Sequence, residues 1–131
     1  MNRIVEKRLL QAAMAIGCVV PLVGGLQGML LGAGVSEHGG QVTLDSHVRY
    51  LSGLLLGIGF GFASAIHAIE KYGDRVTLLT ALVVTGGLAR LFGVLIDGWP
   101  APLMIFALVM ELAIVPTLWL WQRRVARQWM R

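Results

Sequence analysis

The sequence contains little charge and a single cysteine, and each shortage excludes a class of protein. Only 14% of its 131 residues are charged, whereas 56% are hydrophobic. A soluble domain of this size needs a larger polar share to cover its surface. The one cysteine, Cys18, lies within an apolar stretch and excludes an intrachain disulfide. An integral membrane protein is the class that remains.

Nucleic-acid binding and cofactor chemistry are also disfavoured by what the sequence lacks. The chain has 11 basic and 7 acidic residues, but the basic residues lie at the ends of apolar stretches and form no stripe along a polar face. The sequence has no metal-ligand spacing, no nucleotide-binding fingerprint and no nucleophile beside a base. We therefore expect no nucleic-acid partner, no metal and no cofactor, and we favour a binding role over catalysis.

Four apolar stretches are present, each close to the roughly 20 residues that a helix needs to cross a membrane. Pro21 and Pro116 lie inside the first and the last stretch, where a proline bends a helix. Asp45 or Ser46 is suited to be the N-cap of the second helix. The sequence thus predicts an all-α, integral membrane four-helix bundle that forms one transmembrane domain over residues 1–131. The predicted helices span about residues 9–34, 46–67, 76–96 and 103–121.

The basic residues predict how these helices are oriented. Short cytoplasmic segments carry an excess of Lys and Arg, and nine of the 11 basic residues fall on one side if both termini are cytoplasmic. The nine are Arg3, Lys7, Arg8, Lys71, Arg75, Arg123, Arg124, Arg127 and Arg131. We therefore predict a multi-pass protein, embedded in a lipid bilayer, with both termini in the cytoplasm.

Small residues recur at helical spacing and predict closely packed helix faces. Three groups stand out: Gly24, Gly28 and Gly32; Gly53, Gly57, Gly61 and Ala65, headed by Arg49; and Gly86, Gly87 and Gly93, on a face with Arg90. We expect these faces to pack against other helices. The neighbours would belong to this chain, to a second copy of it or to a larger membrane complex.

Arg90 and Glu111 are charged residues inside apolar stretches, and each needs a partner there. A charge at the centre of a bilayer costs at least about 2.5 kcal/mol. At about 1.5 Å per residue, Arg90 lies roughly 9 Å and Glu111 roughly 14 Å below the outer boundary. The tight turn at residues 97–102 makes their helices antiparallel neighbours. We therefore predict that Arg90 and Glu111 form an ion pair.

Other polar side chains lie in the same outer half and allow two interpretations. In the first, the Arg90–Glu111 pair is purely structural, and Arg49 and His47 are interfacial. In the second, the polar side chains line a pocket that binds a lipid- or quinone-like molecule by an anionic or carbonyl group. An accessory subunit of a larger membrane complex, of redox type, is an alternative, and a small membrane enzyme with Glu111 or His47 as acid or base is a third. The predicted pocket residues are Gln27, Asp45, His47, Arg49, Arg90 and Glu111.

Residues 45–53, 86–91 and 118–124, together with Glu111, carry a resemblance to a known family. They resemble the bacterial four-helix membrane family named domain of unknown function 4345. The resemblance covers nearly the whole chain and implies a protein of the bacterial inner membrane, with Arg49, Arg90 and Glu111 as a set. It implies no substrate. In size and helix number alone, the chain is also similar to DoxX-like membrane proteins, some of which accompany quinol-oxidising enzymes.

Overall fold

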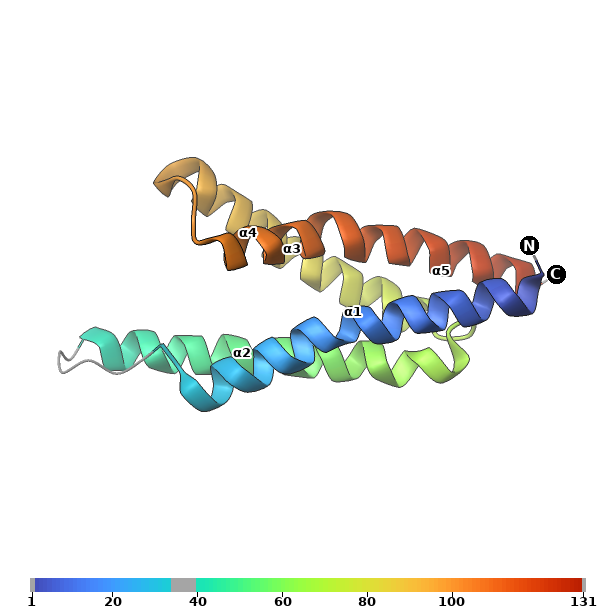
Figure 1. Cartoon of the computed structure of the whole chain (residues 1–131), viewed down its shortest axis with the longest axis horizontal. Coiled ribbons are helices and arrows are strands. Elements are labelled where there is room, and N and C mark those ends of the chain that lie inside the picture. The colour runs from blue at the N-terminus through green and yellow to red at the C-terminus, as the bar shows by residue number, and fades with distance from the viewer. Residues whose placement is uncertain (1, 34–39, 131) are drawn as a thin grey trace. The chain divides into compact units, whose positions relative to one another are not determined.

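The computed structural model describes residues 2–33 and 40–130, and neither range contains a strand (Figure 1). The chain begins with two long helices, α1 (Arg3–Leu31) and α2 (Gly40–Ala65). A single 3₁₀ turn, η1 (Ile66–Ala68), follows α2 and leads to a third long helix, α3 (Gly73–Asp97). The last helical segment consists of α4 (Pro102–Val109), the π-helical η2 (Met110–Ile114) and α5 (Val115–Trp129).

Four of these helical segments are long and apolar enough to cross a membrane. They are Arg3–Leu31, Val42–Ala68, Gly73–Asp97 and Pro102–Trp129. Large apolar side chains such as Ile16, Leu51 and Phe92 are exposed along them, as expected where lipid replaces water around a helix. The prediction of an all-α fold with four membrane-spanning helices is confirmed.

The ends of the first and last helices differ from the prediction. α1 begins at Arg3 rather than near residue 9, and α5 ends at Trp129 rather than near residue 121. The charged start of α1 and the charged end of α5 are helical because their side chains bond one another. For example, the Glu6 carboxylate accepts a hydrogen bond from the Gln128 amide. Hydropathy marks the part of a helix that crosses a membrane and does not mark where the helix ends.

The other helix ends differ by smaller amounts. α1 stops at Leu31 rather than at residue 34, and α2 begins at Gly40 rather than at residue 46. α3 begins three residues before and ends one residue after the predicted span of 76–96. The polar connection between the first two helices was expected at residues 35–45; its first part, residues 35–39, lies outside the described residues.

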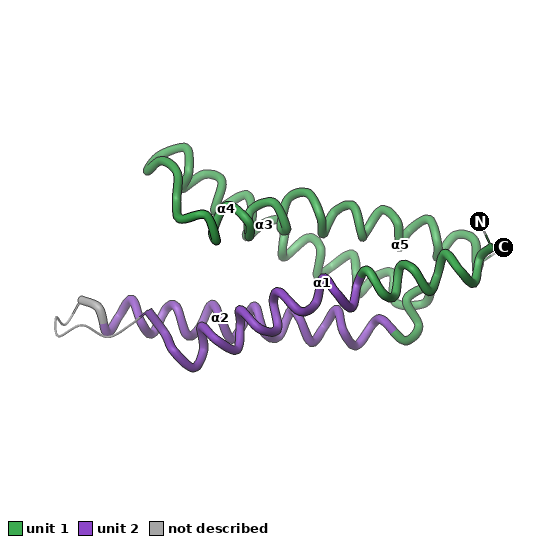
Figure 2. Tube along the Cα trace, in the orientation of Figure 1, with its two compact units in different colours: residues 1–13, 67–131 green, residues 14–66 purple. Residues whose placement is uncertain are grey.

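The chain divides into two compact units (Figure 2). The single transmembrane domain suggested by the sequence stays a prediction. In one unit, residues 14–66, α1 and α2 pack antiparallel through glycines. A Cβ on Gly25 would lie 2.6 Å from the backbone nitrogen of Leu56, and a Cβ on Gly28 would lie 2.9 Å from the Cβ of Ser52. Gly28 of the row predicted on α1 is therefore in close contact. On α2 the contacts use Ser52 and Leu56, which adjoin the predicted Gly53 and Gly57, because no described atom lies within 4 Å of where Cβ atoms of those two glycines would be.

The other unit contains residues 2–13 and 67–130, with α3 antiparallel to the α4–α5 segment. Hydrogen bonds join α5 to the first turns of α3 and to the turn before it: the Trp119 indole donates to the Thr77 hydroxyl of α3, and the Gln122 amide donates to the Ile69 carbonyl, which precedes α3. The most deeply buried side chains lie beside these contacts. They are Leu10, Ile69, Val76, Gln122 and Val125.

The two prolines inside predicted helices have different surroundings. α1 continues as one helix through Pro21. Pro116 lies in the first turn of α5, directly after η2, where the N–H of Val115 bonds the carbonyl of Met110 five residues back. Because a proline ring collides with the carbonyl four residues before it, the wider π-helical turn relieves that collision. The predicted irregularity is therefore a π-helical segment that contains Glu111.

Candidate functional site

Arg90 and Glu111 form a bidentate ion pair between α3 and η2. The Nε of Arg90 lies 3.1 Å from Oε2 of Glu111, and its Nη2 lies 3.1 Å from Oε1. Both side chains are partly exposed, 33% for Arg90 and 18% for Glu111. Two parallel hydrogen bonds fix the plane of the guanidinium as well as its distance from the carboxylate. The two residues paired by counting along the sequence are therefore paired in the structure.

Gly87 permits this close approach of α3 and η2. It lies almost one helical turn before Arg90 and is buried. A Cβ at this position would lie 2.9 Å from Cβ of Glu111 and 2.8 Å from Cδ2 of Leu112, closer than packed side chains allow. Gly86 and Gly93 face open space instead. Of the three glycines expected on the packed face of α3, only Gly87 is in such a contact.

The position of Glu111 within a π-helical segment is a second local feature of the site. Single π-helical turns inside α-helices occur often at functional sites, because they alter the direction of one side chain without breaking the helix. Here the turn carries the only carboxylate of the α4–α5 segment. Since both oxygens of Glu111 accept from Arg90, the carboxylate is occupied as an acceptor and is poorly placed for proton transfer.

A pocket of about 300 Å³ adjoins Arg90 at the end of α3 and the start of α4. Its lining includes Arg90, Gly93, Asp97 and Met104. The third guanidinium nitrogen, Nη1, is not held by Glu111 and lies 3.0 Å from the sulfur of Met104. A thioether is a weak acceptor, so the charged Nη1 group of Arg90 has only a weak hydrogen-bond partner in this pocket.

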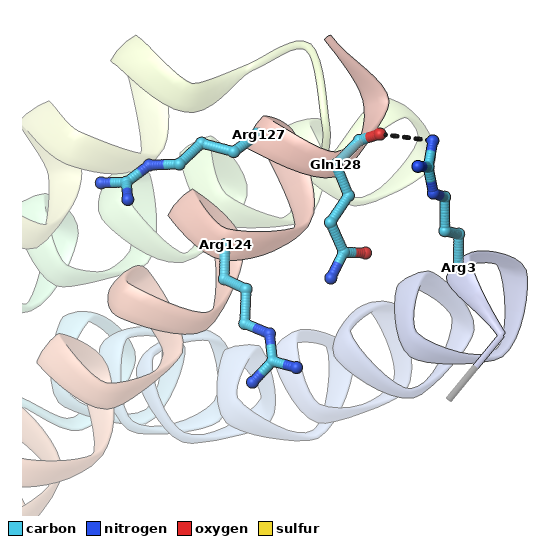
Figure 3. Close-up of a pocket in the computed structure, with 4 residues that line it drawn as sticks. All are labelled: Arg3, Arg124, Arg127 and Gln128. Atoms are coloured by element: carbon cyan, nitrogen blue, oxygen red, sulfur yellow. Dashed lines mark hydrogen bonds between the residues drawn. The ribbon is translucent and has the colours of Figure 1, made fainter. Parts of the chain in front are cut away.

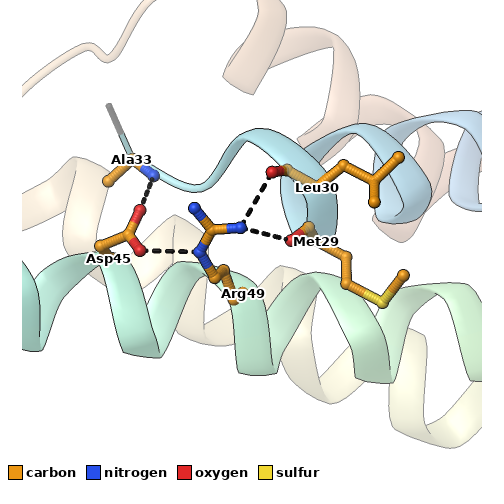
Figure 4. Close-up of polar contacts among 5 residues, drawn as sticks. All are labelled: Met29, Leu30, Ala33, Asp45 and Arg49. Atoms are coloured by element: carbon orange, nitrogen blue, oxygen red, sulfur yellow. Dashed lines mark hydrogen bonds and ion pairs between the residues drawn. The ribbon is translucent and has the colours of Figure 1, made fainter. Parts of the chain in front are cut away.

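Arg49 holds the end of α1 (Figure 4). Its Nη1 donates to the carbonyls of Met29 and Leu30, each at 2.9 Å, and its Nε lies 2.7 Å from Asp45. These carbonyls are among the last of α1, which have no partner within the helix, and a cation there also complements the helix dipole. Arg49 therefore stabilises the junction of α1 with α2.

Asp45 completes this junction and is not the N-cap of α2. The predicted cap at Asp45 or Ser46 is wrong, because α2 begins at Gly40 and both residues lie inside it. The carboxylate of Asp45 instead accepts from the N–H of Ala33 at 2.8 Å, just after Gly32 reverses the chain with a φ of 63°. A Cβ on Gly32 would overlap the Asp45 carboxylate, so this turn requires glycine on two grounds.

The remaining predicted site residues, Gln27 and His47, are exposed side chains of α1 and α2. They belong to the unit that contains Asp45 and Arg49, whereas the Arg90–Glu111 pair belongs to the other unit. The six residues thus fall in two units, with one ion pair between predicted residues in each. The convergence of all six on one pocket stays a prediction. Among the described residues, no group of three His, Cys, Asp or Glu side chains is arranged to hold a metal ion.

The prediction missed a polar cluster formed by the first turns of α1 and the last turns of α5. Glu6 is 2% exposed, and its carboxylate lies 3.1 Å from Nε of Arg124 and accepts from the Gln128 amide at 2.9 Å. A signal was available: Glu6 is the one acid among the basic residues of the first turns, and it stands four residues before the apolar Leu10 and eight before Met14. That spacing places Glu6 on the buried face of the helix.

Lys7 extends this cluster to the turn between η1 and α3. Its Nζ lies 2.9 Å from Oε2 of Glu70. Burial acts to raise the pKa of Glu70, but the hydrogen bond from Lys7 and the charges of Lys7 and Lys71 outweigh it, so the pKa lies below the ordinary value of a glutamate. The Lys7–Glu70 pair therefore ties the start of α1 to this turn.

The family assignment follows from a match over most of the chain. The model of the family described as a domain of unknown function, DUF4345, matches residues 9–122. The chain belongs to this family. The DUF4345 match includes both ion pairs of the predicted site, Asp45–Arg49 and Arg90–Glu111, and leaves out Glu6 and Arg124. No curated protein and no solved structure matches the chain significantly.

Proposed function

We propose that this DUF4345 protein is a multi-pass protein of the bacterial inner membrane that binds a lipid- or quinone-like molecule without catalysing a reaction. The proposal rests on the hydrogen-bond partners of the Arg90 guanidinium. Two of its nitrogens are fixed by Glu111, and the third is aimed at the sulfur of Met104 beside a pocket of about 300 Å³. A ligand oxygen would be a better acceptor for a charged donor than a thioether.

The charges around the pocket favour a carbonyl group over an anion as the group bound. Glu111 already neutralises Arg90, and Asp97 adds a carboxylate to the pocket lining. A further anion would gain little attraction from the neutralised pair and would be repelled by Asp97. A neutral carbonyl oxygen, as in a quinone or a lipid ester, can accept a hydrogen bond from Nη1 of Arg90 in place of the Met104 sulfur, without that repulsion.

The membrane setting of the site is part of the proposal. The first two turns of α1 and the last turns of α5 lie together in one unit, and they carry six of the 11 basic residues of the chain. The positive-inside tendency would put this basic end, with both termini, in the cytoplasm. α3 then runs outward from Gly73, and Arg90 forms an intramembrane ion pair with Glu111 in the outer half of the bilayer. Such residues are costly in lipid and mark functional sites.

The test is a filled pocket with a matched control on the same helix. Gly93 lines the pocket and Gly86 does not, yet neither has a described atom within 4 Å of where its Cβ would be. Gly93→Leu should therefore fill the pocket and weaken binding of a short-chain benzoquinone at least tenfold, whereas Gly86→Leu should leave binding unchanged. Binding is measured on protein in mild detergent by quenching of tryptophan fluorescence. Equal affinities of the two variants, or no quenching in the unaltered protein, would refute the proposal.

A second candidate is an accessory subunit of a larger membrane complex. It is supported by Gly53 and Gly57, four residues apart on α2, which face open space although small residues at this spacing usually admit another helix. Gly53→Leu with Gly57→Leu should then abolish co-purification with a larger assembly after gentle extraction. A chain that runs as a monomer in every mild detergent would count against this function.

A further inference from the structure

A second pocket lies at the end of the unit that contains both chain ends (Figure 3). It has a volume of about 260 Å³ and is lined by Arg3 from the first turn of α1 and by Arg124, Arg127 and Gln128 from the last turns of α5. Three of its four lining side chains are therefore guanidinium groups. They come from opposite ends of the sequence, so the chain assembles this charge by folding.

Two of the three arginines are held in place by specific bonds. Arg124 lies 3.1 Å from the buried Glu6 carboxylate, and Arg3 donates to the backbone carbonyl of Gln128 at 2.9 Å. The Gln128 side chain in turn donates to Glu6. Glu6 thus holds Arg124 and the Gln128 side chain in a site that carries three positive charges.

Arg127 has the fewest bonds of the three arginines. Among residues 2–33 and 40–130 it has neither an ion pair nor a hydrogen bond from its side chain, and it is exposed. Arg127 and Arg124 are three residues apart on α5 and so share a face of the helix, and Figure 3 shows their guanidinium groups extending in different directions. The opposite face of this helix is buried through Val125 and Ala126. The last turns of α5 are therefore amphipathic, with a basic face at the end of a membrane-crossing segment.

We propose that this terminal pocket binds the phosphate group of an anionic membrane lipid. Guanidinium groups bind phosphate oxygens through paired hydrogen bonds, and three of them against one carboxylate leave a net positive site for an anion. A lipid is the source favoured by position, because the arginines lie at the ends of two membrane-crossing segments, at the level of headgroups.

The experiment must separate a pocket from diffuse attraction, and Arg123 provides the matched control. Arg123 is also exposed on α5, but it stacks on the Trp119 ring at 5.7 Å and does not line the pocket. Arg127→Gln and Arg123→Gln therefore change the net charge equally. The full chain, in micelles containing phosphatidylcholine, is titrated with phosphatidylglycerol, and bound lipid is counted by native mass spectrometry.

Arg127→Gln should bind phosphatidylglycerol about fivefold more weakly, the effect of roughly one basic residue at a membrane surface, and Arg123→Gln should match the unaltered chain. Equal losses in the two variants would show diffuse attraction, and no loss in either would show no site; both results overturn the proposal. Arg3→Gln, from the other chain end, should weaken binding as Arg127→Gln does. Far-UV circular dichroism of each variant verifies that it is folded.

A second arm identifies the source of the phosphate. Inorganic phosphate is added to the complex of the unaltered chain with phosphatidylglycerol. If the site recognises a lipid, millimolar phosphate should displace only a small part of the bound phosphatidylglycerol. Displacement at concentrations equal to those of the lipid would instead assign the pocket to a soluble phosphate, and the lipid assignment would be wrong.

Discussion

Replacing Arg90 by methionine should destabilise the protein strongly, and the structure sets the size of the loss. Methionine keeps most of the volume of arginine but leaves both oxygens of Glu111 without their hydrogen bonds at 3.1 Å. Removing one partner of a fully buried pair costs about 3–5 kcal/mol. Arg90 is 33% and Glu111 18% exposed, but in the bilayer setting proposed above this exposure is not to bulk water, so we expect a loss of about 3–5 kcal/mol.

The double variant tests whether this loss arises from the pair itself. With Glu111→Leu added, neither charge remains, and the free energy of unfolding should recover to within about 1 kcal/mol of the unaltered protein. Unfolding is followed by circular dichroism in mixed micelles of increasing denaturing-detergent content. Arg127→Met, which removes an arginine without a described partner, should change stability by less than about 0.5 kcal/mol. Additive losses from the two single variants would refute the reasoning, because independent residues show no recovery.

Two further predictions concern packing and pH. Gly87→Ala should lower the free energy of unfolding by about 1–3 kcal/mol, because its Cβ would press on Glu111 and Leu112. Gly86→Ala, which has open space for its Cβ, should be neutral or slightly stabilising. Similar unfolding free energies for the two variants would contradict the packing argument. The lowered pKa of Glu70 means that its ionised form stabilises the folded state at neutral pH, and this contribution is lost as the pH falls through the acidic range, below about 4.3. The unfolding temperature should therefore fall less steeply with acidification in Lys7→Met than in the unaltered protein, and parallel curves would argue against the pair.

The helices were predictable in their apolar parts and not at their ends. Length and hydropathy suffice for a segment of about 20 apolar residues, because the membrane imposes its thickness on the chain. The ends obey other rules. Residues 3–8 and 122–129 are helical because Glu6, Arg124 and Gln128 bind one another across the unit, and contacts so distant in sequence leave little local trace.

One part of the site, the pairing of Arg90 with Glu111, was predictable from the sequence by counting residues. Arg90 and Glu111 stand on helices joined by a short turn and at similar distances from that turn, so counting residues was enough to pair them. Arg49 was different. Its partners at Met29 and Leu30 depend on where α1 ends and α2 begins, and those ends were placed three and six residues from where they lie. An arginine one turn from a misplaced helix end cannot be assigned its partners.

The bond between Glu6 and Gln128 has a consequence for how the protein is made. Gln128 follows Glu6 by 122 residues, so a ribosome adds it long after the first turn of α1 has emerged. Until then the carboxylate that is 2% exposed in the finished fold has neither Gln128 nor Arg124 to accept from. The first helix can therefore reach its final position only when the last one has been synthesised, and a nascent chain released before Arg124 would keep an unpaired acid at its first turn.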